Sequence, residues 1–282
     1  MTSRTVVVIF FITLIISACS SARISSPGQD VTPPEPTVTF APTITSQPSV
    51  TPIPPMPTKE LIQEVCSPLE GESLASIPEI LTQAFKKPLP GNDDGHTGAD
   101  FAFYRRNEFV GIEGLKVKAA IEGKVVTIIN DRWPYGNAVL IETPLKDISR
   151  ELIGQITLPV NEPTVMPDPR VNCPPGALNF SMDDQSQSLY TLYAHLLNNA
   201  TFTVGDNVGC GEVIGAVGNS GYSSNPHLHF ETRVGPSGAR FDSMAYYTVQ
   251  ATDSERYNYC VWRVSNLFQV FDPMTLLSTQ EK

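Results

Sequence analysis

The sequence predicts a mainly β domain, an antiparallel β-sandwich or barrel-like sheet that carries surface insertions. Short runs rich in β-branched residues recur between residues 117 and 234, separated by glycine- and asparagine-containing turn signals. Before them, residues 20–60 are rich in Pro, Thr and Ser, with ten of the chain's 25 prolines between Pro27 and Pro57. Such a segment cannot bury enough apolar surface to fold. The folded domain is therefore expected to span residues 61–282.

The first 18 residues are predicted to be a lipoprotein signal peptide. Arg4 supplies a short positive region, and Val6 to Ile16 is an apolar run interrupted only by Thr13. This run has the length of a signal-peptide core and is short for a bilayer interior of about 30 Å. The following Ile16-Ser17-Ala18-Cys19 resembles a bacterial lipobox, so Cys19 is the predicted lipidation site. An ordinary signal peptide or a marginal membrane anchor is the alternative.

Residues 19–60 are interpreted as a linker behind the lipidated cysteine. Proline favours an extended chain, which at about 3.1 Å per residue reaches on the order of 100 Å. Such a spacer suits a domain that acts away from the bilayer. A tether that only keeps the domain soluble is the other interpretation.

Seven strands and one helix are predicted within the domain. The strands are Val117–Ala120, Gly123–Ile129, Ala138–Glu142, Ser188–His195, Thr201–Val204, Glu212–Val217 and His227–Val234. The helix is Pro78–Phe85, because proline is tolerated in a first helical turn. The stretches at about 144–187 and 235–256 interrupt this rhythm and are interpreted as surface insertions. The first insertion would form a cleft wall, a lid or a partner-docking surface.

Charge and cysteine content restrict the class of protein. The formal net charge of −10 argues against a nucleic-acid partner, which would require a basic surface. Beyond Cys19 the cysteines are Cys66, Cys173, Cys210 and Cys260, an even number that favours two disulfides in an exported protein. The absence of a C-x-x-C pair argues against a thiolate zinc site. We expect Cys66–Cys260, which would join the domain ends, and Cys173–Cys210, which would pin the first insertion.

The four histidines are the candidates for chemistry. His96 precedes Asp100 by four residues, and His195 ends a predicted strand. His227 and His229 lie two apart in a strand-like run, so both side chains share one face. Catalytic zinc typically has three N or O ligands and one open position. Two imidazoles and Asp100 would supply these ligands, and two further imidazoles would serve proton transfer. Scattered structural histidines are the alternative.

These patterns resemble the signatures of the lysostaphin/LytM-type zinc peptidases, in the same order along the chain. The three signatures are His96-x-Gly98-x-Asp100, Tyr193-Ala194-His195-Leu196 and Pro226-His227-Leu228-His229-Phe230-Glu231. Supporting stretches include Gly136-Asn137-x-Val139, Gly205-Asp206-x-Val208 and Gly218-Asn219-Ser220-Gly221. The resemblance covers roughly residues 94–277, interrupted by the two insertions.

The resemblance implies an antiparallel β fold of the duplicated hybrid motif type and a metalloendopeptidase activity on peptidoglycan crosslinks or stem peptides. It assigns one Zn²⁺ to His96, Asp100 and His229, and the catalytic roles to His195 and His227. The protein would be exported and lipid-anchored to a bacterial membrane, facing the cell wall. The rivals are a non-catalytic activator of the same fold, a metal- or wall-binding module, and a zinc peptidase of general protein substrates.

Residues near these motifs are candidates for substrate contact. They are Tyr193, Asn219, Ser220 and Ser223. A strand tyrosine that packs at the sheet edge is an at least equally good interpretation of Tyr193, and a plain turn is the alternative for the loop of Ser220–Asn225. The loop lacks the G-K-[ST] of a phosphate cradle.

Overall fold

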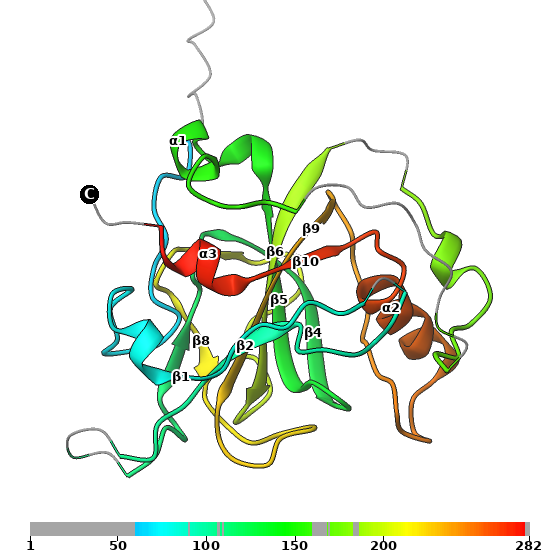
Figure 1. Cartoon of the computed structure of the whole chain (residues 1–282), viewed down its shortest axis with the longest axis horizontal. Helices are drawn as coiled ribbons and strands as arrows, with labels where there is room; N and C mark the ends of the chain where they lie inside the picture. The colour runs from blue at the N-terminus through cyan, green and yellow to red at the C-terminus, as the bar shows by residue number, and fades with distance from the viewer. Residues whose placement is uncertain are drawn as a thin grey trace, which may run out of the picture. The chain divides into compact units, whose positions relative to one another are not determined.

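The described part of the chain contains two antiparallel sheets and several short helices in the computed structural model (Figure 1). The structure describes residues 60–89, 91–105, 108, 110–159, 168, 170–182 and 186–279. The main sheet has the order β1-β2-β9-β6-β5-β4-β7, with β10 paired to β9 off this path, and β3 pairs with β8 in a second sheet. The predicted signal peptide, Cys19 and the linker up to residue 59 lie outside the described residues.

The bounds of the elements are as follows. The strands are β1 Leu81–Gln83, β2 Gly98–Phe101, β3 Lys116–Lys118, β4 Gly123–Arg132, β5 Gly136–Pro144, β6 Gln187–Leu196, β7 Asn207–Val208, β8 Val213–Ala216, β9 Leu228–Pro236 and β10 Gln269–Phe271. The α-helices are α1 Arg150–Ile153, α2 Asp253–Arg263 and α3 Pro273–Leu277. Short 3-10 helices are η1 Ile77–Ile80, η2 Leu145–Asp147 and η3 Ala177–Asn179.

The central strands of the main sheet are buried on both faces. In β5, Val139 and Ile141 join one apolar cluster, whereas Ala138 and Leu140 join the other. Because side chains alternate along a strand, an almost continuous apolar run buries both sides. The main sheet therefore forms the middle layer and needs a cover on each face.

Different segments supply the two covers, as Figure 1 shows for α2 and α3 on opposite sides of the central strands. The first cluster contains Val117 of β3, Ile214 of β8 and Leu276 of α3. The second contains Phe241 before α2 and Trp262 within it. The interpretation of 235–256 as a surface insertion is therefore wrong for its apolar side chains, which form the core on that face.

Most central strands agree with the prediction, and the elements at the periphery differ. The strands expected at 123–129, 138–142, 188–195, 212–217 and 227–234 correspond to β4, β5, β6, β8 and β9. The strand expected at Thr201–Val204 is absent, and the chain pairs instead at β7. The helix expected at Pro78–Phe85 is wrong, because η1 ends at Ile80 and β1 then pairs with β2.

Four cysteines form two disulfides, but the expected pairing is wrong. Cys66 bonds Cys210, and Cys173 bonds Cys260. Cys66 meets Cys210 because both segments pair with one stretch: Cys66 N donates to the carbonyl of Ala120, and Gly211 N donates to that of Ala119. Cys260 lies in α2, which packs beside η3 just after Cys173. The spacing of the cysteines along the chain does not indicate which of them pair.

Among the described residues, the helices are all too short or too polar to cross a lipid bilayer.

Candidate metal centre and catalytic site

Strand pairing brings the sequence-predicted residues together. Asp100 of β2 lies opposite His229 of β9, and Ala194 of β6 lies opposite His229 on the other side. His195 follows Ala194, and His227 immediately precedes β9 in a bridge to Gly218. The sheet order β2-β9-β6 thus gathers side chains from three strands at one place.

The candidate metal ligands form a tight cluster. One ligand atom each from His96, Asp100 and His229 lies within 4.8 Å of the other two. Asp100 Oδ1 is 2.7 Å from His229 Nδ1 and 3.1 Å from His96 Nε2. The three side chains are about nine-tenths buried. Two imidazole nitrogens and a carboxylate oxygen are a donor set that suits Zn²⁺.

The ring nitrogens that face away from the centre are fixed by acceptors. His96 Nδ1–H donates to the carbonyl of Ala84 at 3.0 Å, since a carbonyl can only accept. His229 Nε2–H donates to Glu231 Oε1 at 3.1 Å. Each ring therefore presents its other nitrogen to Asp100, which is the orientation a metal ligand needs. The residues fit the metal that the resemblance implies.

Hydrogen bonds within this cluster stabilise the charged forms of Asp100 and His229. Burial by itself would raise the pKa of Asp100, but hydrogen bonds with His229 and His96 outweigh burial and lower it. Burial by itself would lower the pKa of His229, but hydrogen bonds with Asp100 and Glu231 raise it to about 9. In the metal-free protein His229 is thus a cation between two carboxylates, and a metal would have to replace its Nδ1 proton.

His195 and His227 face the cluster as a second pair. Their ring centroids are 4.7 Å apart, and His227 Nε2 lies 3.6 Å from Asp100 Oδ2. His195 Nδ1–H donates to the carbonyl of Ser220, and His227 Nδ1–H donates to that of Asn225, both at 2.8 Å. In both rings Nε2 is consequently the nitrogen left for exchange of a proton.

The backbone of His195 is in the left-handed region, with φ of 61°. Non-glycine residues seldom adopt this conformation, and it persists where surrounding contacts enforce it. Here the amide of His195 donates to the carbonyl of Tyr135, and its carbonyl accepts from Gly218 N. Burial lowers the pKa of His195 to about 3, with further lowering by the neighbouring His229 and His227. The imidazole is therefore neutral at physiological pH.

Gly98 permits the approach of β2 to His229. A Cβ at this position would lie 2.7 Å from His229 Cε1 and 2.6 Å from the carbonyl of Phe230. These separations are too short for real atoms, so only glycine fits. Gly98 is the first residue of β2, and the ring of His229 packs against it.

The candidate substrate contacts have different positions. Tyr193 is fully buried, and its hydroxyl accepts from Ala120 N at 2.7 Å, so it packs in the core of an interior strand, neither in contact with substrate nor at the sheet edge. Ser220 links β6 and β5, because its Oγ donates to the carbonyl of Leu196 and accepts from Asn137 N. Asn219 is exposed, and Ser223 Oγ lies 2.6 Å from its Oδ1 and 3.1 Å from His227 Nδ1.

Several residues around the site have no role in the sequence argument. Glu231 is fully buried and accepts from Thr97 Oγ1 at 2.7 Å and Tyr135 OH at 3.1 Å, besides His229. Its position two residues after His229 was a signal, because strand residues two apart share a face. Nothing in the local sequence marks Thr97 or Tyr135.

The antiparallel β domain thus places two histidines and one aspartate around a point where they could hold a metal ion, with two further histidines beside it. Residues 176–242 match the family model "Peptidase family M23".

The chain is similar to several curated proteins and solved structures. The DD-carboxypeptidase/endopeptidase Mpg of Neisseria meningitidis is 28% identical over 161 residues, which cover 57% of this chain and 25% of that protein. The chain thus spans about a quarter of the length of the curated relatives it matches. The lysostaphin catalytic domain of Staphylococcus simulans shares 21% identity, with 73% of this chain and 98% of that one covered and a TM-score of 0.36. A zinc-containing peptidase of Vibrio cholerae shares 20% identity over 54% of this chain and 32% of that one, with a TM-score of 0.31.

Proposed function

We propose that this protein is a zinc metalloendopeptidase that hydrolyses peptide bonds in peptidoglycan crosslinks or stem peptides. The observation that carries the proposal is the convergence of His96, Asp100 and His229 with the second pair, His195 and His227. A site that only bound metal would not require that pair. The name of the Neisseria relative, with its DD-carboxypeptidase and endopeptidase activities, supports peptidoglycan peptides as substrate.

His96 Nε2, His229 Nδ1 and a carboxylate oxygen of Asp100 would hold the metal. When bound, zinc lowers the pKa of a coordinated water and polarises the scissile carbonyl. Asp100 offsets part of the added charge, and Glu231 keeps His229 in the ligand orientation. Because the ligand side chains are about nine-tenths buried, bulk water has little access and charges interact strongly.

His195 and His227 would handle protons and the developing oxyanion. Each donates Nδ1–H to a backbone carbonyl, so each ring is oriented and its Nε2 can accept a proton or, once protonated, donate a hydrogen bond. His195 is neutral at physiological pH and therefore able to accept a proton. The left-handed backbone of His195 fixes this ring at the end of β6.

We further propose that the domain is exported and held on a membrane through a diacylated Cys19, with residues 20–60 as spacer. The lipobox-like Ile16-Ser17-Ala18-Cys19 and the proline-rich composition support this proposal. The Cys19→Ser variant should leave the membrane fraction for the soluble fraction of the cell envelope. Continued membrane retention would indicate an uncleaved anchor.

The catalytic proposal is tested with the purified domain from Leu61 onward and purified sacculi. Mass spectrometry should detect released peptides with the wild type and none with His229→Ala or His195→Ala. Zinc content should be about one per chain in the wild type, lost in His229→Ala and largely kept in His195→Ala. If the wild type binds zinc but releases no peptide from any wall type, the proposed enzymatic activity is overturned and a non-catalytic activator is favoured.

A further inference from the structure

The buried carboxylate of Glu231 is shared between the metal centre and helix α2. Its Oε1 lies 3.1 Å from His229 Nε2 and 3.3 Å from Arg263 Nη1, where Arg263 is the last residue of α2. Its Oε2 accepts from Arg233 Nε at 3.1 Å. The two arginines therefore hold different oxygens, and Arg263 holds the oxygen that accepts from the metal-ligand ring.

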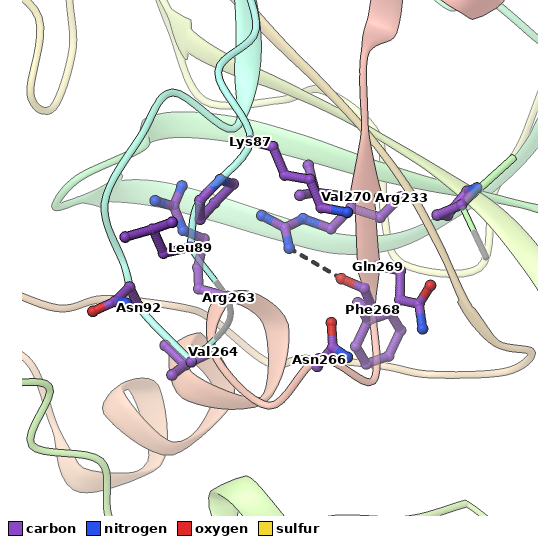
Figure 2. A pocket seen from close by; sticks show the side chains of 13 residues that line it. Lys87, Leu89, Asn92, Arg233, Arg263, Val264, Asn266, Phe268, Gln269 and Val270 are labelled. Atoms are coloured by element: carbon purple, nitrogen blue, oxygen red, sulfur yellow. Dashed lines mark hydrogen bonds between the residues drawn. The ribbon is translucent and has the colours of Figure 1, made fainter. Parts of the chain in front are cut away.

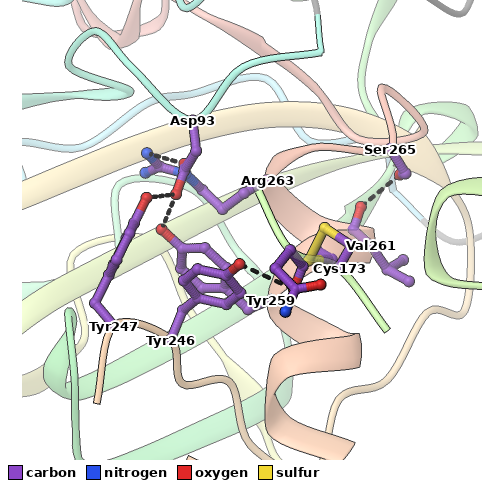
Figure 3. Close-up of a disulfide and its surroundings, with 10 residues drawn as sticks. Asp93, Cys173, Tyr246, Tyr247, Tyr259, Val261, Arg263 and Ser265 are labelled. Carbon is purple, nitrogen blue, oxygen red and sulfur yellow. Dashed lines mark hydrogen bonds and ion pairs between the residues drawn. A yellow bond between two sulfur atoms is a disulfide. The ribbon is translucent and has the colours of Figure 1, made fainter. Parts of the chain in front are cut away.

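Arg263 is itself held from two directions. Its Nη1 donates to Thr97 Oγ1, which in turn donates to Glu231 Oε1. Its Nε and Nη2 lie 2.7 Å from Asp93 Oδ1. Asp93 Oδ2 accepts from the hydroxyls of Tyr247 and Tyr259, and Figure 3 shows these groups converging on the carboxylate. The guanidinium is thus an oriented bridge, with a side chain only 12% exposed.

The backbone that carries Arg263 is also fixed. Cys260, one turn earlier, is bonded to Cys173, as Figure 3 shows. Trp262 is buried, and Arg233 lies over its ring at 4.7 Å from the centroid. Arg233 also donates to the carbonyls of Trp262 and Phe268, and the latter bond is drawn in Figure 2 beside the pocket that both arginines line. The end of α2 therefore has little freedom to move.

We propose that Arg263 is a positioning residue of the metal centre: through Glu231 it fixes the ring of His229 with Nδ1 turned towards Asp100. This inference rests on the metal site of the proposed function. Without the guanidinium, Glu231 Oε1 loses a cationic neighbour, and Thr97 loses its link to α2. Thr97 and Tyr135 then hold Oε1 without the guanidinium that ties it to α2, so the acceptor of His229 Nε2 is less firmly positioned and the ring less well oriented.

The test compares zinc affinity among variants of the purified domain, by competition with a chelator and without any substrate. Arg263→Ala should weaken zinc binding about 10- to 100-fold, the loss typical when a group that orients a metal ligand is removed. Arg256→Ala is the matched control, because Arg256 lies in the same helix but pairs with Asp253 in an exposed ion pair. Its zinc affinity should stay within about twofold of the wild type. The visible spectrum of bound Co²⁺ should change in Arg263→Ala and remain unchanged in Arg256→Ala.

Arg263→Lys serves as the conservative variant and as the safeguard against misfolding. Lysine keeps the charge, but one ammonium cannot span Asp93, Thr97 and Glu231 as the guanidinium does. Its zinc affinity should lie between those of the wild type and Arg263→Ala. If Arg263→Ala does not fold, Arg263→Lys compared with Arg256→Lys decides the question.

Zinc affinity equal to the wild type in the folded Arg263 variants, with only their thermal stability reduced, would overturn the inference and leave Arg263 a purely structural residue. This result differs from failure of the proposed function. If the wild type binds zinc but cleaves no wall peptide, the proposed peptidase activity is overturned. The dependence of zinc affinity on Arg263 would still hold in that case.

Discussion

Gly98 packs directly against the ring of His229 in the candidate metal centre. The Gly98→Ala variant should displace the ring of His229, since its Cβ would lie 2.8 Å from His229 Nε2. Zinc affinity should fall on the order of tenfold or more, as for other changes that misorient a ligand. Chelator competition measures the loss, with Gly209→Ala as control because its Cβ would meet only Glu212 Oε2 at 3.7 Å. Equal affinities of the two variants would contradict this account.

Because the pKa of His229 is raised, metal uptake at the proposed site should depend on pH. Below the pKa of about 9 the metal must displace the Nδ1 proton, so protons compete with zinc. Apparent zinc affinity should therefore rise about tenfold per pH unit between pH 6 and 8 and level off near pH 9. The measurement is a chelator titration at several pH values, corrected for the chelator's own protonation. Affinity that does not change over this range would show that His229 is not protonated in the metal-free protein.

The five candidate site residues could be located from the sequence. Two of the patterns that contain them, His96 with Asp100 and His227 with His229, span only a few residues. The alternation of a strand alone places His227 and His229 on one face, and the structure confirms that both contact Asp100. The partners of Glu231 could not be located in the same way. Thr97 is 134 residues away and Arg263 is on another element, so only the folded chain brings them together.

Strand β6 holds Tyr193 in the core of the domain. Tyr193→Phe removes the hydroxyl that accepts from Ala120 N and leaves a buried amide without a partner, which should cost about 1–3 kcal/mol of unfolding free energy. Peptide release by the folded variant should be unchanged, because Tyr193 is not accessible to substrate. Denaturant unfolding and the sacculus assay measure the two effects. Tyr222→Phe, at an exposed tyrosine, is the control for stability. A loss of activity in Tyr193→Phe without a loss of stability would restore the role in substrate contact.

The predicted elements agree best where burial is strongest. β4, β5 and β6 are long and apolar, so their β-branched runs identify them. β1 and β10 have three residues each and exist only through their partners β2 and β9. Helix α2 did carry a local signal, since Thr252 and Glu255 form a capping box at its start. That signal was missed because the segment was interpreted as an insertion.

The three-layer arrangement of the molecule was not foreseeable from strand patterns, which do not say what covers a sheet. The segment before α2 covers one face with Phe241 and Met244, and the small β3–β8 sheet covers the other. Both disulfides join a covering segment to a part of the chain far away in sequence, at separations of 144 and 87 residues.

Stability of the whole domain should depend on the longer of these bridges. Replacing Cys66 and Cys210 together by serine removes a constraint on the unfolded chain and should lower the unfolding free energy by about 2–5 kcal/mol. Denaturant unfolding of the double variant and of the wild type gives the difference. A reducing agent should destabilise the wild type more than the variant. Unchanged stability of the double variant would show that the contacts around Ala119 and Ala120 suffice without the bond.

The two disulfides enclose overlapping parts of the chain, 66–210 and 173–260. A single backbone cut anywhere from residue 67 to residue 259 therefore lies inside at least one covalent ring. A molecule that a protease nicks once in this interval would lose no fragment. It would migrate as one intact chain in denaturing electrophoresis and would separate into two pieces only after reduction.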